Sequence, residues 1–163
     1  MLYFSEFCSP IGKITIVCNS SSIIGLWFKN QKYYLGNIKE KLIRKDDLNI
    51  IVKTKEFLCN YFNGNASRSK NLKLAPRGTP FQLRVWNELL KIPYGTTTTY
   101  GEIAKTLGNK MSAQAVGSAI SHNPISIIIP CHRVIAADGS LTGYAGGLEK
   151  KKFLLELEGI NIK

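Results

Sequence analysis

The stretch from residue 63 to residue 78 separates two halves of the chain that differ in the spacing of their apolar residues. It is polar and irregular, and it ends in Ala75-Pro76-Arg77-Gly78. Proline, glycine and polar residues at this density are typical of a loop between domains. Since 163 residues suffice for one medium domain or two small ones, we expect two domains, residues 1–78 and residues 79–163.

The amino-terminal half has the pattern of a small sheet followed by a helix. Residues 12–18 and residues 23–28 are rich in β-branched and aromatic side chains, and a Ser/Asn turn lies between them. These features predict two half-buried antiparallel strands. Residues 48–62 place apolar side chains at helical spacing and are followed by Asn63-Gly64, which is typical of a helix end.

The carboxy-terminal half carries clear signals for where helices begin. Thr79-Pro80-Phe81-Gln82 has the form of a capping box with proline at the first helical position. Thr99 and Glu102 have the spacing of a second box, before a helix expected over residues 100–107. We predict a helix after each box, and Pro93-Tyr94-Gly95 ends the first of them.

The next signals predict a helix-turn-helix. Gly108-Asn109 turns the chain after the helix over residues 100–107, and Ser112 caps a second helix that extends to about residue 121. This second helix has small, uncharged residues over 113–120. Such a helix fits either a close approach to a narrow groove or plain packing in the core, and these residues alone leave both interpretations open.

Composition favours a polyanionic partner without locating its binding surface. The chain has 22 Lys and Arg residues against 11 Asp and Glu residues, a formal charge of +11 and a sequence pI near 9.6. A basic protein attracts nucleic acids in general. However, residues 1–79 carry a net charge of +8 and residues 80–163 only +3, so the half with the helix-turn-helix is the less basic one.

No feature of the sequence indicates a membrane span, a metal site or a cofactor. The longest apolar run has about six residues, and the amino terminus lacks the basic start and apolar stretch of a secretory signal, so we expect a cytoplasmic protein. Cys8, Cys18 and Cys59 lie among apolar neighbours and are expected to be reduced core thiols. With no C-x-x-C pair, two histidines and no glycine-rich phosphate loop, we expect neither a metal nor a cofactor.

The strongest chemical signal lies in residues 127–134. Three isoleucines precede Pro130, so a strand is expected to stop there and to present Cys131 and His132. A cysteine becomes a nucleophile when a nearby base or positive charge favours its thiolate. From these residues alone, Cys131 is either such a nucleophile or a buried thiol of the core.

Three further features follow this pair. Ala137-Asp138-Gly139-Ser140 predicts a turn, and residues 143–147 predict a flexible loop against which a flat ligand could lie. The last helix is expected from Leu148 to Glu158, before Gly159. The macrodipole disfavours an acid at the carboxyl end of a helix, so Glu158 hints at a functional role.

Together, these segments resemble the O6-alkylguanine-DNA alkyltransferase family. The resemblance is most specific over residues 80–159, and residues 1–78 match the amino-terminal domain of the family more loosely. It implies an α+β fold with an amino-terminal, strand-rich ribonuclease H-like domain and a carboxy-terminal winged helix-turn-helix domain. The matching segments are Pro80-Phe81-Gln82, Pro93-Tyr94-Gly95, Tyr100-Gly101-Glu102-Ile103-Ala104, Ala115-Val116-Gly117, Asn123-Pro124, Ile128-Ile129-Pro130-Cys131-His132-Arg133-Val134 and Gly143-Tyr144-Ala145-Gly146-Gly147-Leu148.

The resemblance also implies a role for each residue of a reactive site. Cys131 would attack the alkyl carbon on O6 of guanine and keep the group irreversibly, and His132 would take the thiol proton through a bound water. Glu158 would orient and polarise His132. Tyr100 would give a hydrogen bond or proton to guanine N3, and Asn123 would brace the turn that joins the recognition helix to the active-site strand.

Contacts with the substrate are implied at two places. The guanine would be read mainly by backbone groups, near Cys131 and at Val134, Tyr144, Ala145 and Gly146. The second helix of the helix-turn-helix would enter the minor groove while the damaged nucleotide is flipped out. The residues of that helix that are expected at the DNA are Ser112, Ala113, Gln114, Ala115 and Gly117.

The implied partner is double-stranded DNA that contains O6-alkylguanine, with O4-alkylthymine as a further substrate, and the implied state is a monomer without a cofactor. Arg133 is expected either to contact DNA or to hold the active-site loop. Two positions depart from the pattern of the family, since many members have arginine in place of Gln114 and some have serine in place of Ala145. Glutamine lacks the charge and planar guanidinium of arginine, so we expect slower or weaker base flipping.

Three other functions share parts of this pattern. Alkyltransferase-like proteins recognise lesions on the same scaffold but lack the reactive cysteine, whereas Cys131 is present. A hydrolytic Cys-His enzyme needs an oxyanion hole and a route for water, and the sequence shows neither clearly. A damage sensor needs further acceptor cysteines in its first domain, and Cys8 and Cys18 do not resemble the metal-held cluster of such sensors.

Overall fold

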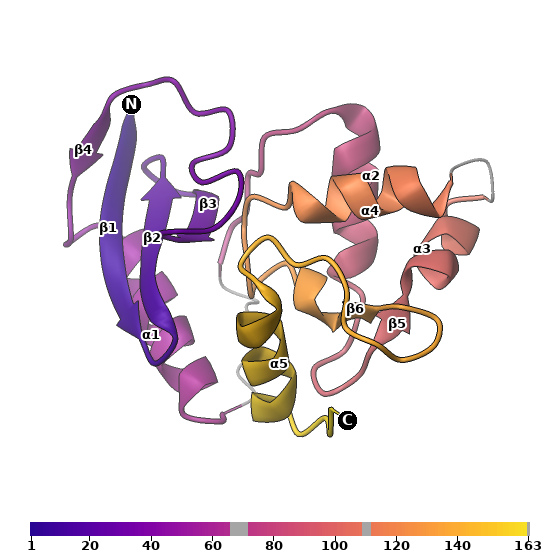
Figure 1. Ribbon diagram of the computed structural model, residues 1–163. Helices are drawn as coiled ribbons and strands as arrows, with labels where there is room; N and C mark the ends of the chain where they lie inside the picture. Colours follow the sequence, from indigo (N-terminus) through magenta and orange to yellow (C-terminus); the bar gives the residue numbers. More distant parts are fainter. Residues whose placement is uncertain (66–71, 109–111, 163) are drawn as a thin grey trace.

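The amino-terminal half is built on a four-stranded sheet (Figure 1). The computed structural model describes residues 1–65, 72–108 and 112–162. The strands of the sheet are β1 (Leu2–Ser9), β2 (Gly12–Cys18), β3 (Ile23–Phe28) and β4 (Leu42–Arg44). Their order is β3-β2-β1-β4, with antiparallel pairing among β1, β2 and β3 and parallel pairing of β4 with β1. The two strands that the sequence predicts, over residues 12–18 and 23–28, are confirmed.

The two faces of the sheet pack into two different apolar clusters. Because side chains alternate along a strand, Ile14 and Ile16 of β2 join the main core, and Val17 joins a smaller cluster on the opposite face. The helix α1 (Asn49–Phe62) contributes to the main core and confirms the helix predicted over residues 48–62. The loop after β3 covers the smaller cluster with its partly buried apolar side chains.

The strand β3 connects the two halves of the molecule. All six of its residues are buried, although it lies at the end of the strand order. Its outer edge is hydrogen-bonded, since Leu26 N donates to Pro124 O (2.7 Å) and Ser126 N donates to Leu26 O (2.9 Å). An edge strand covered in this way presents no free backbone groups. The same contact fixes residues 124–126, which precede Cys131, against the sheet.

The carboxy-terminal half is mainly helical and confirms the predicted α+β fold class. Figure 1 shows α2, α3 and α4 gathered on the side away from the sheet, with α5 between them and the amino-terminal half. A short parallel pair, β5 with β6, joins Thr98 to Val134. The elements are α2 (Pro80–Leu89), β5 (Thr98–Thr99), α3 (Tyr100–Thr106), α4 (Ala113–Ser121), the 3-10 turn η1 (Cys131–Arg133), β6 (Val134–Ile135) and α5 (Leu148–Leu157).

The helix starts follow the predicted capping residues. Thr79 and Gln82 form both hydrogen bonds of the capping box, with Pro80 in the first turn of α2. Thr99 Oγ1 accepts from Glu102 N (3.1 Å), which is one of the two bonds predicted for the second box. Ser112 Oγ accepts from Ala115 N (3.0 Å) and caps α4. Of the predicted turn between α3 and α4, Gly108 has φ of 100° and Asn109 lies outside the described residues.

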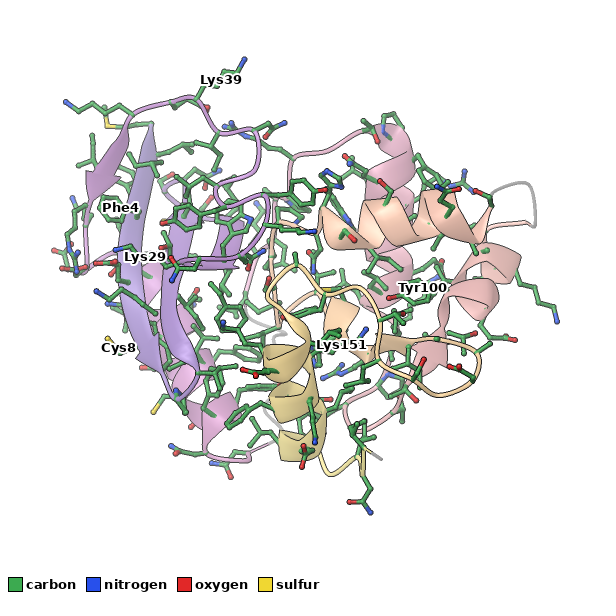
Figure 2. The ribbon with its side chains drawn as sticks, viewed as in Figure 1. Phe4, Cys8, Lys29, Lys39, Tyr100 and Lys151 are labelled. Carbon is green, nitrogen blue, oxygen red and sulfur yellow. The ribbon has the colours of Figure 1, made fainter. Side chains whose placement is uncertain are left out.

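The prediction of three buried cysteines besides Cys131 is correct for Cys18 and wrong for Cys8 and Cys59. Phe7 stacks on Phe62 of α1, so its neighbour Cys8 points to the other side of β1, and Figure 2 shows it at the outer side of the sheet. Cys59 follows the buried Leu58 and lies on the outer face of α1. All four thiols are free.

Two further observations concern the described residues only. None of their helices is long and apolar enough to cross a membrane. They also contain no group of three or more His, Cys, Asp or Glu side chains that could hold a metal ion.

Candidate active site

The buried side chain of Asn123 joins both ends of the turn that leads to Cys131. Its Nδ2 donates to Ile129 O (2.8 Å), and its Oδ1 accepts from Ile125 N (3.0 Å). A single amide side chain therefore ties the two ends of the turn together: it supplies the partner of Ile125 N and a second donor to Ile129 O, which also accepts from Cys131 N (2.8 Å). This placement agrees with the bracing role that the resemblance implies.

The strand predicted immediately before Pro130 is wrong. Ile127 adopts φ of 71°, which β-branched residues rarely do, and Ile129 N donates back to Ile125 O (3.0 Å). The segment is thus a pair of tight buried turns. A run of isoleucines is equally apolar in a strand and in a buried turn, so its composition could not separate the two.

Cys131 lies in the turn η1 with 6% of its surface exposed. Burial raises the pKa of the Cys131 thiol, while a hydrogen bond from Asn123 and the charge of Lys151 act in the opposite direction. The raised pKa keeps the resting side chain in its protonated form at neutral pH. Nucleophilic attack by this sulfur therefore requires a base close by.

His132, the neighbour of Cys131 in the chain, is fully buried and is held by Glu158. Its Nε2 lies 2.6 Å from Glu158 Oε2, and burial lowers the pKa of the imidazole, so the ring is neutral. A carboxylate only accepts hydrogen bonds, so Nε2 carries the proton and Nδ1 keeps its lone pair. Nδ1 is buried and has no hydrogen-bond partner among the described residues. The imidazole therefore presents an unprotonated nitrogen.

Glu158 receives hydrogen bonds from four residues. Oε2 accepts from Tyr61 (2.6 Å), His132 (2.6 Å) and Arg133 Nη2 (3.1 Å), and Oε1 accepts from Arg133 Nε (2.7 Å) and Gly95 N (3.2 Å). Burial acts to raise the pKa of Glu158, but these donors outweigh it and lower the pKa to about 2. The donors also offset the unfavourable position of an acid at the end of α5.

Arg133 is directed into the protein. Besides its two bonds to Glu158, its Nη1 donates to Ile92 O (2.8 Å), and its guanidinium lies 5.6 Å from the centre of the Tyr94 ring. Only 10% of the side chain is exposed. Of the two roles expected for Arg133, these contacts support the one that holds the active-site loop.

Tyr100 lies at the start of α3 and points towards the loop that follows β6. Its hydroxyl donates to Thr142 O (2.9 Å), and burial raises its pKa. It lines a hollow of about 380 Å³ at the surface of the helix-turn-helix. The other lining residues are Ala113, Gln114, Gly117, Ser121, Thr142 and Gly143. The expected proton donor and the expected DNA-contacting residues thus share one depression.

The sequence analysis missed Lys151, a fully buried lysine close to this hollow. Its Nζ donates to Val134 O (2.6 Å) and Thr142 O (2.8 Å), and it lies 5.9 Å from the centre of the Tyr100 ring. Figure 2 shows Lys151 and Tyr100 on neighbouring elements. Burial lowers the pKa of Lys151 to about 8. Its position on the same helical face as Leu154 and Leu155 is the signal that could have revealed it.

Tyr61 is a second residue of this buried centre that was not expected from the sequence. It lies in the apolar stripe of α1, whose helical spacing predicts a core position and gives no sign of a polar contact. Its hydroxyl connects the amino-terminal half to Glu158. A buried tyrosine hydroxyl needs a hydrogen-bond partner, and that requirement was the available signal.

The residues expected to read the guanine lie in β6 and in the loop that precedes α5. Val134 follows η1 directly, and Tyr144 is half-buried, with a buried hydroxyl that has no partner among the described residues. Ala145 O accepts from Lys32 N (3.0 Å) of the amino-terminal half. Gly146 has no room for a side chain, because an added Cβ would lie 2.7 Å from the Tyr144 ring. The loop therefore has a defined shape where a planar ligand could lie.

The helix α4 is packed on one side and open on the other. Val116, Ala119 and Ile120 are buried in the core. The residues expected at DNA lie on the remaining side, where Ala113 and Gln114 are exposed. The structure therefore confirms packing in the core for one face of this helix, and a close approach of the other face to a groove stays a prediction. The open face has side chains small enough for the backbone to come close to another surface.

Two family models match the chain one after the other. The model described as 6-O-methylguanine DNA methyltransferase, ribonuclease-like domain, matches residues 2–76. The model described as 6-O-methylguanine DNA methyltransferase, DNA binding domain, matches residues 80–160. The two matches meet close to the expected domain boundary.

Individual proteins are similar over nearly the full length. The methylated-DNA–protein-cysteine methyltransferase of Haemophilus influenzae is 42% identical over 98% of this chain and 87% of the relative. That of Methanosarcina acetivorans is 45% identical over 97% of this chain and 99% of the relative. A crystal structure of Mycobacterium tuberculosis OGT in complex with DNA superposes with a TM-score of 0.87 at 42% identity, covering 96% of this chain and 92% of that one.

Proposed function

This chain belongs to the 6-O-methylguanine DNA methyltransferase family, and we propose that it repairs DNA by moving the alkyl group of O6-alkylguanine onto Cys131. The observation that carries the proposal is the buried arrangement of Cys131, His132 and Glu158, in which a nucleophile is followed by a base and the base is held by a carboxylate. This is the order of groups that nucleophilic catalysis needs. The activity is that of a methylated-DNA–protein-cysteine methyltransferase.

The chemical step is a displacement at the alkyl carbon. The Cys131 sulfur forms a bond to that carbon while the bond from the carbon to O6 breaks, and the electron pair of that bond stays on the guanine. His132 Nδ1 takes the thiol proton through a bound water, and Tyr100 supplies a hydrogen bond or proton to guanine N3. For that purpose the Tyr100 hydroxyl turns away from Thr142 O, to which it donates in the free protein.

The reaction consumes the protein. The product is a thioether, from which the Cys131 thiolate is a poor leaving group, so the alkyl group stays on Cys131 and each molecule acts once. A hydrolytic cysteine enzyme would instead release its intermediate to water, which requires an ester-like intermediate and an oxyanion hole. The presence of Cys131 also separates this chain from alkyltransferase-like proteins, which lack the reactive cysteine.

Duplex DNA is the proposed partner, and the face of α4 formed by Ser112, Ala113, Gln114, Ala115 and Gly117 is the proposed contact. The small side chains suit the minor groove, and phosphate contacts suit a repair protein that acts regardless of sequence. Since Cys131 is buried, the damaged nucleotide is flipped out of the stack to reach it. We extend the proposal to O4-alkylthymine as a second substrate and to action as a monomer.

The test is to incubate the protein with duplex DNA that carries one O6-methylguanine and to map the peptides by mass. The proposal predicts one added methyl group per protein molecule, located on Cys131, and none in Cys131→Ser. Cys18→Ser is the matched control, because it removes another buried thiol and should leave the transfer intact. An unmodified Cys131 after long incubation with excess DNA would contradict the proposal.

A further inference from the structure

The segment from Gln31 to Tyr33, which follows β3, contacts the carboxy-terminal half in three places. Gln31 Oε1 accepts from Ser126 Oγ (3.4 Å) in the turn before Cys131. Lys32 N donates to Ala145 O (3.0 Å) in the loop before α5, which is part of the proposed guanine site. Tyr33 stacks on His122, with ring centres 3.9 Å apart and planes inclined by 23°. The amino-terminal half thus reaches the proposed substrate loop and the end of α4 with three successive residues.

The residue under Tyr33 ends the recognition helix. His122 is the C-cap of α4, and its Nδ1 lies 2.8 Å from Ser118 O, so the ring is tied to the last turn of the helix. On another side, Trp86 Nε1 of α2 donates to Ala119 O (2.8 Å). The last carbonyl groups of a helix lack partners within the helix. Here Ser118 O and Ala119 O, which share the backbone N–H of His122, each gain a side-chain partner, and these contacts fix the carboxyl end of α4 while its amino end stays open.

The backbone of Tyr33 is unusual for a residue that is 48% exposed. Its φ is 57°, in the left-handed region, and Leu35 (φ 64°) and Gly36 (φ 55°) follow in the same region. Residues other than glycine adopt this conformation at a cost, and they keep it where surrounding contacts determine it. Leu35 is held by the smaller apolar cluster of the sheet, whereas the stack on His122 is the contact that directs Tyr33.

We propose that Tyr33 is a positioning residue for DNA binding, which holds the carboxyl end of α4 through His122 and thereby sets the angle at which the open face of α4 meets the duplex. The inference rests on the proposed function, because it assigns α4 to the DNA. Under this proposal the amino-terminal half contributes to DNA recognition, although none of the residues of that half belongs to the proposed DNA contact. A helix of nine residues turns as a rigid rod, so a small shift at its carboxyl end displaces its amino end.

The experiment compares two substrates, since a free base does not need α4. Single-turnover alkyl transfer is measured with duplex O6-methylguanine and with the free O6-methylguanine base. Tyr33→Ala is expected to slow the duplex reaction by about two- to twelve-fold, the factor that corresponds to one aromatic pair. The rate with the free base is expected to stay that of the original protein, and Tyr33→Phe, which keeps the ring, is expected to restore the duplex rate.

The matched control is Tyr34→Ala, which removes the next aromatic ring along the loop. Tyr34 bonds to Thr15 and lies edge-on to Trp27, both within the amino-terminal half. This variant is expected to lower stability and to leave the ratio of the two rates unchanged. The inference is overturned if Tyr33→Ala leaves the duplex reaction unchanged, or if it slows both substrates equally.

Affinity for an unmodified duplex, measured by fluorescence anisotropy, separates this inference from the proposed function. Weaker binding by Tyr33→Ala but not by Tyr33→Phe supports the role of Tyr33 even without a chemical step. Equal binding by all three proteins overturns that role. If the original protein does not become methylated on Cys131 with either substrate, the proposed function is overturned. The role of Tyr33 in DNA binding is then tested by the anisotropy measurement alone.

Discussion

The buried centre around Glu158 and the open face of α4 differ in how tightly their side chains are held. We assign the chemical step to the first and the contact with DNA to the second. Glu158 accepts five hydrogen bonds from four residues, and the imidazole and thiol next to it are almost completely buried. The open face of α4 has Gln114 as its one long side chain among small residues. The first region fixes one protonation state and one geometry, as a single reaction requires. The second offers few specific contacts, which suits the surface that we propose for DNA of any sequence.

The contrast predicts different responses to mutation. A buried charge network loses much when one member is removed, because the remaining charges stay buried without partners. An exposed face changes little in stability when a side chain is altered. Substitutions at the centre should therefore strongly affect both folding and chemistry, and substitutions on the open face of α4 should act mainly on the reaction with duplex DNA and change stability by at most about 1 kcal/mol.

The largest effect is expected for Glu158→Gln. This change leaves the Arg133 charge buried without its partner and removes the carboxylate that fixes the proton on His132 Nε2. We expect a rate of methyl transfer lower by about 10²- to 10⁴-fold and a loss of about 3–5 kcal/mol in unfolding free energy. Single-turnover kinetics and urea unfolding measure the two quantities. Glu156→Gln, on an exposed position of the same helix, is the control, and a Glu158→Gln rate close to that of the control would refute the assignment.

Acid is expected to destabilise the protein through the same centre. Burial lowers the pKa of His132 below its ordinary 6.5, and the donors around Glu158 outweigh its burial and lower its pKa from 4.5 to about 2. In acid the unfolded chain therefore binds more protons than the folded one. The contribution of these two groups to the free energy of unfolding is complete above pH 6.5 and is lost as pH falls towards about 2. For Glu158 the shift corresponds to about 3 kcal/mol. Urea unfolding across this range should show the loss, and a smaller loss in Glu158→Gln; equal slopes in both proteins would contradict it.

On the open face, Gln114→Arg is expected to strengthen the reaction with duplex DNA. Arginine adds a cation next to a polyanion and a planar group that can fill the space of a flipped base. We expect affinity for duplex to rise a few-fold and its dependence on salt to steepen by about one unit in the log–log slope. Asn65→Arg adds the same charge far from α4 and serves as the control. Unchanged affinity and an unchanged single-turnover rate for Gln114→Arg would remove Gln114 from the proposed contact.

The smallest effect is expected for Gly117→Ala. This variant also separates stability from DNA binding most clearly, because the two are expected to change in opposite directions. An added Cβ would make ordinary contact with the Tyr100 ring at 3.9 Å, so the fold accommodates it. Alanine in a helix interior is more favourable than glycine by about 0.5–1 kcal/mol, so the variant should unfold at higher urea concentration. If α4 approaches the duplex closely at this residue, the more stable variant should also react more slowly with DNA. A variant that gains stability and keeps its duplex rate would place Gly117 outside the contact.

Local signals in the sequence were sufficient for most of the fold. Thr79-Pro80 and Ser112 mark helix starts because a side chain must satisfy backbone donors there, and the structure confirms both. The alternation in residues 12–18 identified a strand, because its two faces pack against different clusters. The first strand, β1, gave no such signal, since buried Leu2 and Ser5 are separated by half-buried residues of mixed polarity.

Long-range contacts explain what the sequence could not predict. The turn before Cys131 depends on the Asn123 side chain and on hydrogen bonds to β3. Neither contact can be predicted from the run of isoleucines itself. Tyr61 and Glu158 are far apart in the sequence and meet only through the packing of α1 against the carboxy-terminal half. The sequence left open whether Arg133 contacts DNA or holds the active-site loop. Its buried contacts with Ile92 and Glu158 favour the second role.

The central claim is that Glu158 holds His132 as a neutral base with its lone pair on Nδ1. Nitrogen-15 chemical shifts of the imidazole test this most directly, because they distinguish protonated from unprotonated ring nitrogens. The chain has only two histidines, and His122→Phe assigns the signals while keeping a ring for Tyr33 to stack on. The account predicts a protonated Nε2 and an unprotonated Nδ1 on His132 at neutral pH. A proton on Nδ1, alone or in an imidazolium, would contradict it.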